Sequence, residues 1–301
     1  MSATLGIDAG GSQTRWALLG SDQSILSEGS IAGFSALELG CESGDRKVSD
    51  ILESLSDQVL GRGGVSGVHA GVSGFGGLQE RSGQTLHALM AQHFKLPGEA
   101  VVLSNDSELA CLAAFEPGMG YLVYAGTGSI AGFVDAQREF HRAGGRGGIL
   151  DDGGSGYWIT VQALRKIWRA EDEKPGCWIA SPMAVSLFKA IGGSDWSCSR
   201  QLIYGASRGR IGQLALAVAA AADCDPVARD ILQRAGVELA RLGSAMIARF
   251  GIRPVVLAGR VPQLHRLIEQ SMRQCLPPEC DLRLVNLQAH IAAARLALKR
   301  G

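Results

Sequence analysis

Two segments of the chain, far apart in the sequence, share one pattern in which a β-rich run leads through a glycine turn into a second β-rich run. The first covers residues 4–19 and turns at Gly10 and Gly11, and the second covers residues 121–134 and turns at residues 126–129. Glycine tolerates the backbone angles of such hairpins, and the flanking apolar runs favour strands. The repeat predicts two similarly built α/β domains.

The predicted boundary lies near Pro117, so that residues 1–117 form the first domain and residues 118–301 the second. Further β-rich runs lie at residues 25–28, 68–72, 101–103, 255–257 and 282–285. Helical periodicity predicts helices over residues 45–60, 80–94, 211–222, 226–250 and 288–299. Asp225 is the expected cap of the helix that begins at residue 226. The alternation of strands and helices predicts an α/β fold.

The composition is that of a folded protein without a strong net charge. Hydrophobic residues make up 46% of the chain and charged residues 19%, and 29 basic residues balance 29 acidic ones. Without a basic run, nucleic acid is not an expected partner. No apolar run reaches membrane-spanning length, so we expect a cytoplasmic protein with no membrane partner. The seven scattered cysteines include no Cys-x-x-Cys pair, which argues against a disulfide framework or a zinc site.

The first glycine turn has the composition of a phosphate clamp. It reads Asp8-Ala9-Gly10-Gly11-Ser12-Gln13-Thr14. The glycines let backbone amides approach a phosphate, Ser12 and Thr14 add hydroxyl donors, and Asp8 is placed to hold Mg²⁺ or its water shell. The alternative is an ordinary hairpin in which the glycines only make the turn. The turn is neither a P-loop, because the Gly-Lys-Ser/Thr ending is absent, nor a dinucleotide fingerprint, because it leads into a strand.

Two other polar segments are candidate sites. The second glycine turn reads Gly126-Thr127-Gly128-Ser129, which taken alone also fits a tight turn. Asn105 and Asp106 lie where the strand at residues 101–103 meets a helix that runs to residue 115. In the simplest interpretation Asp106 caps this helix by accepting hydrogen bonds from free backbone amides.

Together these motifs resemble the actin-like ATPase superfamily, which includes sugar kinases, acetate kinases and chaperone ATPases. The turn after Asp8 resembles its first phosphate motif, and residues 126–129 resemble its other phosphate loop. Residues 144–159 resemble the Gly-Gly-x-Gly…Asp-x-Gly-Ser-x-Tyr-Trp-Ile signature of N-acetylglucosamine kinases and of the related BadF/BadG-type ATPases. A strand that ends in Ala258-Gly259 resembles the adenosine motif, which has Gly-Gly there, although a plain strand-to-helix turn also fits.

The resemblance implies two ribonuclease-H-like domains, each a mixed five-stranded sheet flanked by helices, with ATP and Mg²⁺ in a cleft between them. It implies that Asp106 is the catalytic base and that Asp8 holds the metal. The expected nucleotide-binding residues are Gly10, Gly11, Ser12, Gln13, Thr14, Gly126, Thr127, Gly128, Ser129 and Gly259. The expected sugar-binding residues are Ser35, Asn105, Asp106, Gly144, Gly145 and Asp152.

The implied reaction is transfer of the γ-phosphate of MgATP to a hydroxyl, the 6-hydroxyl, of an amino sugar, foremost N-acetylglucosamine. Amino-sugar kinases supply an Asn to the sugar after the third strand, whereas this chain has Ala36 there and only Ser35 as a partial substitute. Glucosamine, another hexose derivative or an altered specificity is therefore an alternative.

Two alternatives lie outside the sugar kinases. Dehydratase-activating ATPases of the same fold hold an iron-sulfur cluster through cysteines, and the scattered cysteines here do not resemble that pattern. A non-catalytic nucleotide-binding regulator would usually lack the base at Asp106. Relatives often dimerise, so a homodimer is an open expectation.

Overall fold

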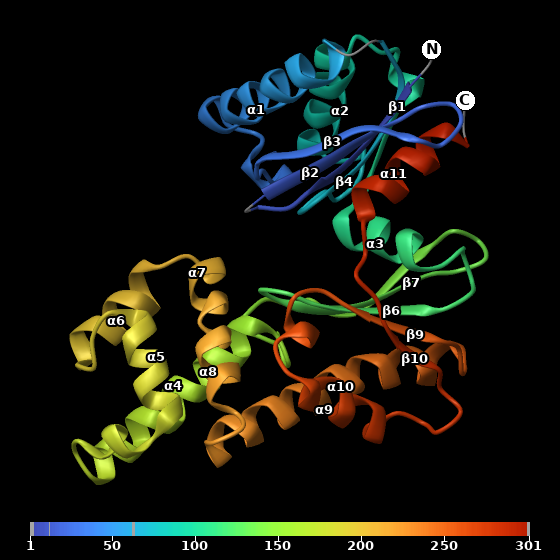
Figure 1. Cartoon of the computed structure of the whole chain (residues 1–301). Helices are drawn as coiled ribbons and strands as arrows, with labels where there is room; N and C mark the ends of the chain where they lie inside the picture. Colours follow the sequence, from blue (N-terminus) through green and yellow to red (C-terminus); the bar gives the residue numbers. More distant parts are fainter. Residues whose placement is uncertain (1–2, 12, 62–63, 300–301) are drawn as a thin grey trace. The chain divides into compact units, whose positions relative to one another are not determined.

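The structure of the chain, a computed structural model, consists of two compact units (Figure 1). The first unit comprises Met1–Glu116 and Leu287–Gly301, and the second comprises Pro117–Asn286. Each unit contains one mixed sheet of five strands flanked by helices, which confirms the predicted fold class. The residues that the structure describes are 3–11, 13–61 and 64–299. Ser12, one of the expected phosphate ligands, lies outside the described residues.

The sheet of the first unit has the strand order β3-β2-β1-β4-β5. Its strands are β1 (Ala3–Ala9), β2 (Gln13–Leu19), β3 (Ile25–Ala32), β4 (Val65–Val72) and β5 (Val101–Asn105). β2 is antiparallel to both β1 and β3, whereas β4 is parallel to β1 and β5 to β4. The central strand β1 is buried almost throughout, as expected for a strand that is covered on both faces.

Helices cover both faces of this sheet. They are α1 (Glu42–Leu60), α2 (Arg81–Phe94), α3 (Asp106–Ala114) and α11 (Ala289–Leu298), with two short 3-10 helices at Ala36–Glu38 and Gly98–Ala100. The apolar sides of α1 and α2 form one core with Leu5 and Ile7 of β1. α3 and α11 pack on the opposite face, where Leu109 of α3 lies so close to Gly71 that a Cβ atom there would be 2.5 Å from it.

Helix α11 comes from the far end of the sequence and packs directly on β1. A Cβ atom on Gly6 would lie 2.0 Å from the carbonyl oxygen of His290, so only glycine fits beneath the helix. Thr4 Oγ1 donates a hydrogen bond of 2.9 Å to the carbonyl oxygen of Ala294. The sequence placed this helix with residues 118–301. The structure places it in the first unit, because its apolar side is buried against β1 and β2.

The sheet of the second unit repeats the topology of the first, with the strand order β10-β9-β6-β7-β8. Its strands are β6 (Tyr121–Ala125), β7 (Ser129–Val134), β8 (Phe140–Gly144), β9 (Val255–Ala258) and β10 (Leu282–Leu284). β6, β7 and β8 are antiparallel neighbours, and β9 and β10 run parallel to β6. The two glycine hairpins predicted from the sequence are therefore β1–β2 and β6–β7.

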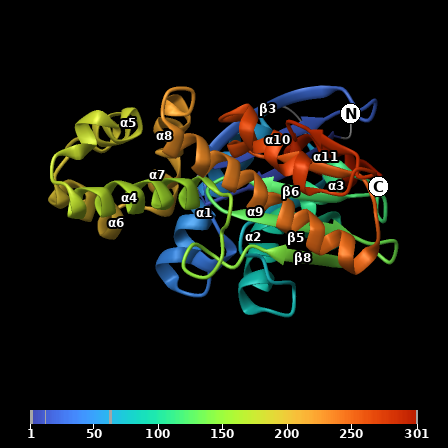
Figure 2. The ribbon, with the colours of Figure 1, turned by 90° about the horizontal axis from the view of Figure 1, so that it is seen from below.

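The second unit is richer in helix than the first. Its helices are α4 (Gly156–Glu173), α5 (Pro182–Ile191), α6 (Trp196–Gly205), α7 (Arg208–Gln213), α8 (Ala215–Ala221), α9 (Pro226–Phe250) and α10 (Arg266–Cys275). α9 and α10 share a core with the sheet, and α4 to α8 form a helical group to one side of it (Figures 1 and 2). None of the described helices combines the length and the apolar character needed to cross a bilayer.

One predicted helix of this unit is broken in two. The sequence predicts a single helix over residues 211–222, but α7 ends at Gln213 and α8 begins at Ala215. Between them the amide of Leu214 donates to the carbonyl oxygen of Ile211, 3.1 Å away, which is the tighter bonding of a 3-10 turn. Ile211 and Leu214 are both buried, so packing of two apolar side chains accompanies the break.

Candidate functional site

Two carboxylates gather at one end of the sheet of the first unit. Asp8 is the penultimate residue of β1, and Asp106 is the first residue of α3, directly after β5. Burial and the nearby charge of Asp106 raise the pKa of Asp8 to about 6, although the guanidinium of Arg15, its cross-strand neighbour on β2, acts in the opposite direction. A half-buried pair of like charges is suited to hold a divalent cation, which removes the repulsion.

Asp106 is held by the first turn of its own helix. Its Oδ1 accepts hydrogen bonds from the amide of Ser107 at 2.7 Å and from the hydroxyl of Ser107 at 3.2 Å. Burial raises the pKa of Asp106, while the hydrogen bonds from Ser107 and Ser73 oppose the shift. The cap of α3 is Asn105, whose Oδ1 accepts from the same amide at 3.0 Å and whose Nδ2 donates to the carbonyl oxygen of Phe75. Asp106 thus shares the capping function with Asn105, and its catalytic role stays a prediction.

The glycine turn beside these carboxylates leaves polar groups free for a ligand. The amide of Gly10 donates to the carbonyl oxygen of Gln13 at 3.1 Å and so closes the turn itself. A Cβ atom on Gly11 would meet no heavy atom within 4 Å, so this residue faces open space. The Oγ1 of Thr14 is buried and has no hydrogen-bond partner among the described residues. A buried hydroxyl without a partner is costly unless a ligand or water supplies one, which fits a phosphate or hydrated-metal site.

Ser35 is tied into the loops around Asp106. Its hydroxyl donates to the carbonyl oxygen of Ser73 at 2.9 Å and accepts from the amide of Leu37 at 3.2 Å. Ser73 in turn hydrogen-bonds Asp106 through its side chain. The hydroxyl of Ser35 is thus used to cap a 3-10 helix, and Ala36 beside it is fully buried. Ser35 therefore lies near Asp106, but the hydroxyl of Ser35 already forms hydrogen bonds within the fold.

The second glycine turn lies at the amino end of α4. The amide of Gly126 donates to the carbonyl oxygen of Gly128 at 2.9 Å, which closes the turn. The carbonyl oxygens of Gly126 and Thr127 accept from the first amides of α4, those of Gly156 at 2.9 Å and Tyr157 at 3.3 Å. The helix therefore fixes the loop, and the amides of Thr127 and Gly128 form no hydrogen bond with any described residue.

Asp152 lies against this turn. A Cβ atom on Gly128 would be 3.2 Å from Oδ1 of Asp152, and the carboxylate of Asp152 is paired with the guanidinium of Arg208. Burial raises the pKa of Asp152, while Arg208 acts to lower it. The hydroxyl of Ser129 donates to the carbonyl oxygen of Gly153 at 2.7 Å, which ties the turn to the chain just after Asp152. The sequence assigned Asp152 to the sugar and Gly128 to the phosphates, and the structure shows that the two are neighbours.

The remaining predicted glycines of the second unit have steric reasons for their identity. Gly144 and Gly145 have φ angles of 70° and 65°, and the amide of Gly145 donates to the carbonyl oxygen of Ser129 at 3.0 Å. Gly259 has a φ angle of 101°, and a Cβ atom there would lie 2.2 Å from the carbonyl oxygen of Ala125. Gly259 therefore touches the strand end that leads into the second glycine turn. Its adenosine role stays a prediction.

Two features of the second unit lie away from the glycine turns. Asp135, Glu139 and His141 have potential metal-ligating atoms within 4.8 Å of one another at the opposite end of β7 from Ser129. A hydrogen bond of 2.7 Å between the ring of His141 and the carboxylate of Asp135, with a second one from the amide of Glu139 to Asp135, accounts for their closeness as hairpin contacts.

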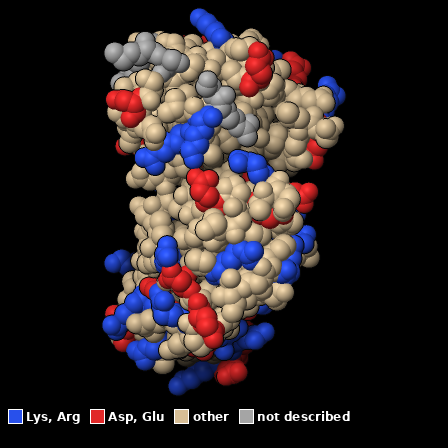
Figure 3. All heavy atoms as spheres, turned by 90° about the vertical axis from the view of Figure 1, so that its right-hand side faces the viewer, with Lys and Arg blue, Asp and Glu red and all other residues tan. Residues whose placement is uncertain are grey.

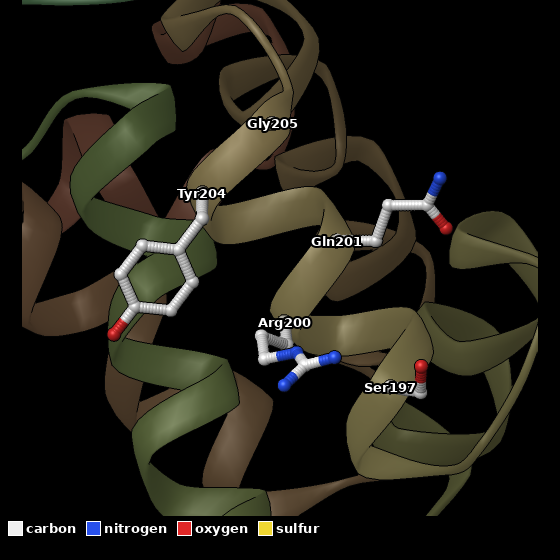
Figure 4. A pocket seen from close by; sticks show the side chains of 5 residues that line it. All are labelled: Ser197, Arg200, Gln201, Tyr204 and Gly205. Atoms are coloured by element: carbon white, nitrogen blue, oxygen red, sulfur yellow. The ribbon is translucent and has the colours of Figure 1, made fainter.

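A hollow of about 470 Å³ lies on one face of α6 and is shown in Figure 4. Its lining residues are Ser197, Arg200, Gln201, Tyr204 and Gly205. All five belong to one helix, and none is a predicted site residue. On the face drawn in Figure 3, basic and acidic side chains are interspersed in both units, in keeping with the balanced charge of the chain.

Each unit contains a five-stranded sheet of the same topology, with a glycine turn after its first strand. This twofold arrangement defines the actin-like ATPase class of proteins. Within that class the chain belongs to the BadF/BadG/BcrA/BcrD ATPase family, which its sequence matches over residues 5–276. The family resemblance inferred from the motifs is thereby confirmed.

Solved structures extend this likeness over the whole chain. A candidate N-acetylglucosamine kinase from Chromobacterium violaceum is 25% identical over 99% of both chains, with a TM-score of 0.74. Another from Porphyromonas gingivalis is 15% identical over 98% of this chain and 99% of that one, with a TM-score of 0.76, and this likeness concerns the fold alone.

A curated relative matches part of the chain. The N-acetylmuramic acid/N-acetylglucosamine kinase of Clostridium acetobutylicum is 30% identical over 176 residues, which are 58% of this chain and 56% of that enzyme. The match therefore spans just over half the length of that relative.

Proposed function

We propose that this protein is an ATP-dependent kinase that transfers the γ-phosphoryl group of MgATP to a hydroxyl of an amino sugar. N-acetylglucosamine is the proposed acceptor, and its 6-hydroxyl is the proposed position. The observation that carries the proposal is the pair of half-buried carboxylates, Asp8 and Asp106, beside a glycine turn where the hydroxyl of Thr14 has no partner among the described residues. Membership of an ATPase family and the names of the amino-sugar kinases among its relatives support it.

In this proposal Asp106 is the general base. Its carboxylate accepts the proton of the sugar hydroxyl as that oxygen attacks the γ-phosphorus and the bond to ADP breaks. The raised pKa of Asp106 makes the carboxylate a better proton acceptor than an exposed aspartate. The two hydrogen bonds from Ser107 hold its Oδ1, and the side chain of Ser73 adds a further hydrogen bond to the carboxylate.

The residues that fit MgATP are those with unused polar groups. Asp8 would hold Mg²⁺, which supplies positive charge against the phosphate oxygens when bound. Four groups have no hydrogen-bond partner among the described residues and are proposed phosphate ligands: the amide of Gly11 and the hydroxyl of Thr14 in the first unit, and the amides of Thr127 and Gly128 in the second. Gly145 and Asp152 are the proposed sugar contacts of the second unit, and Gly259 the proposed adenosine contact.

The test is ADP release from MgATP with N-acetylglucosamine, glucosamine, glucose or no sugar. We expect release that depends on an amino sugar, and a loss of about 10²-fold or more in turnover for Asp106→Asn with little change in nucleotide affinity. Asp57→Asn, which alters an exposed aspartate on α1 of the same unit, is the matched control and should be active.

Two results would contradict the proposal. Near-normal turnover of Asp106→Asn would remove that residue from the mechanism. Equal hydrolysis with and without each sugar would favour an activator ATPase that couples hydrolysis to a protein partner.

A further inference from the structure

A buried carboxylate lies directly against the second glycine turn. The side chain of Asp152 is only 3% exposed, and its Oδ1 and Oδ2 would lie 3.2 Å and 3.3 Å from a Cβ atom on Gly128. The amides of Thr127 and Gly128 are the proposed phosphate ligands of this turn. A bare carboxylate in this place would repel the phosphates that the two amides are proposed to bind. Phosphate binding at this turn therefore requires a cation that offsets the charge of Asp152.

The guanidinium of Arg208, the first residue of α7, supplies that positive charge. Its Nη2 donates to Oδ2 of Asp152, so a single carboxylate group separates the guanidinium from Gly128. The guanidinium also lies over the ring of Tyr157, with its Cζ 5.6 Å from the ring centroid. A charge-assisted hydrogen bond and a cation–π contact together hold the guanidinium beside the turn.

The backbone that carries Arg208 is anchored to the same turn. A Cβ atom on Gly212 of α7 would lie 3.5 Å from the Cα atom of Thr127. On the other side, Oγ1 of Thr160 in α4 donates to the carbonyl oxygen of Ile211 at 2.9 Å. Because α7 has only 6 residues, these tertiary contacts rather than its own hydrogen bonds fix its position. Arg208 is therefore presented to the turn from a fixed place.

The guanidinium of Arg208 has donors to spare. Within the described residues Asp152 is the one group that accepts a hydrogen bond from it, and a guanidinium carries several further N–H groups. The side chain of Arg208 is 52% exposed, so these N–H groups are open to a ligand. They form a planar fork that matches the oxygens of a phosphate.

We infer that Arg208 binds the phosphates of the nucleotide, with Asp152 as the carboxylate that holds its guanidinium in place. The inference rests on the proposed function, to which it adds a phosphate contact outside the two glycine turns. Arg208 then brings positive charge to phosphate oxygens that the amides of Thr127 and Gly128 also bind. The ion pair further explains how a buried carboxylate is compatible with an anion site, since Asp152 and Arg208 together carry no net charge.

The experiment measures the Kd of ADP and of adenosine, each with Mg²⁺, by calorimetric titration of the unaltered protein and of variants. We expect Arg208→Gln to raise the Kd of ADP about tenfold or more and that of adenosine by less than about twofold, because only ADP offers phosphate oxygens. Arg200→Gln, which removes an exposed arginine on α6, is the matched control and should change neither value.

A double variant separates a phosphate contact from mere neutralisation of Asp152. Arg208→Gln leaves the buried carboxylate unpaired, whereas Arg208→Gln combined with Asp152→Asn leaves two neutral side chains in its place. If Arg208 contacts the phosphates, the double variant should still bind ADP about fivefold or more weakly than the unaltered protein. Recovery of the original Kd in the double variant would show that Arg208 only offsets the charge of Asp152, and would overturn the inference.

The remaining outcomes distinguish this inference from the proposed function. An unchanged Kd of ADP in Arg208→Gln, or an equal loss for adenosine and ADP in both variants, would overturn the phosphate contact and leave the kinase proposal standing. If the unaltered protein binds ADP in the expected way but releases none from MgATP with any sugar, the kinase proposal fails and the role of Arg208 stands. A protein that binds no ADP at all would contradict both.

Discussion

At the scale of single residues, Asp8 shows a conflict between stability and binding. A half-buried carboxylate near Asp106 is costly to ionise, and the pKa of Asp8 is accordingly raised from 3.8 to about 6. The same features make it a good partner for a cation. The ligand-free protein therefore carries a destabilising charge at neutral pH that a bound cation would relieve.

Asp8→Asn is expected to stabilise the ligand-free protein in a pH-dependent way. Because the folded state binds the proton of Asp8 more tightly than the unfolded state, the unaltered protein loses stability as the pH rises from about 4 to about 6, and the variant does not. Above that range the variant should be more stable by about 1–3 kcal/mol, and the difference should vanish near pH 3.5. Urea unfolding across this pH range measures the difference in the free energy of unfolding. A variant that is less stable than the unaltered protein at neutral pH would contradict the prediction.

At the scale of secondary-structure elements, one carboxylate fixes the starts of two helices. Asp225 Oδ1 accepts from the amides of Val227 at 2.9 Å and Ala228 at 3.2 Å at the start of α9. Its Oδ2 accepts from the hydroxyl of Ser181 at 2.7 Å and the amide of Met183 at 3.0 Å at the start of α5. Burial alone would raise the pKa of Asp225, but these four hydrogen bonds hold it below its usual value.

Asp225→Ala should therefore lower the free energy of unfolding more than the loss of an ordinary helix cap does. It leaves donors of two helices without partners inside the protein, and we expect a loss of about 2–4 kcal/mol in the free energy of unfolding of the second unit. Asp195→Ala is the matched control, because Asp195 caps only α6 and should cost about 1 kcal/mol. Thermal unfolding of both variants measures the difference. Equal losses of stability in the two variants would show that the cap at the start of α5 does not contribute to stability.

At the scale of the whole molecule, the chain passes from the first unit to the second after Glu116 and returns at Leu287. The return makes the first unit depend on the last helix of the chain. Helix α11 lies on β1 through Gly6, and its apolar side completes the core on that face of the sheet. The stability of the first unit is therefore tied to packing between the two ends of the sequence.

Gly6→Ala should disturb the first unit selectively. The added methyl group would lie within 2.2 Å of backbone atoms of α11, so the helix has to move, at a cost of about 1–3 kcal/mol or more. Hydrogen exchange should become faster in α11 and β1 and stay unchanged in α9 of the second unit. Gly205→Ala, at a position where a Cβ atom meets nothing within 4 Å, should leave exchange unaltered in both units. Unchanged exchange in Gly6→Ala would show that α11 adjusts freely.

The features that the sequence predicted correctly depend on residues that are close together along the chain. The two glycine hairpins arise from apolar runs on either side of a turn, and the cap of α9 arises from Asp225 before Pro226. The residues of the candidate site were chosen in the same way, from short motifs that contain Asp8 and the glycines of both turns, and their roles stay predictions. Such patterns can be recognised without knowledge of the tertiary structure, because turns and helix caps depend on neighbouring residues.

Other features were decided only by tertiary structure. Three examples are the placement of α11 in the first unit, the break at Leu214 and the contact of Asp152 with Gly128. Each involves packing partners that no local sequence pattern identifies. The same holds for the buried hydroxyl of Thr14 and for the raised pKa of Asp8, which arise from burial and from a carboxylate far along the chain. The sequence by itself determined the two glycine hairpins and the cap of α9, and it supplied side chains that are chemically suited to a phosphate site. Tertiary packing decided which of those side chains are neighbours and how strongly they are desolvated, because burial and charge proximity are properties of the folded chain.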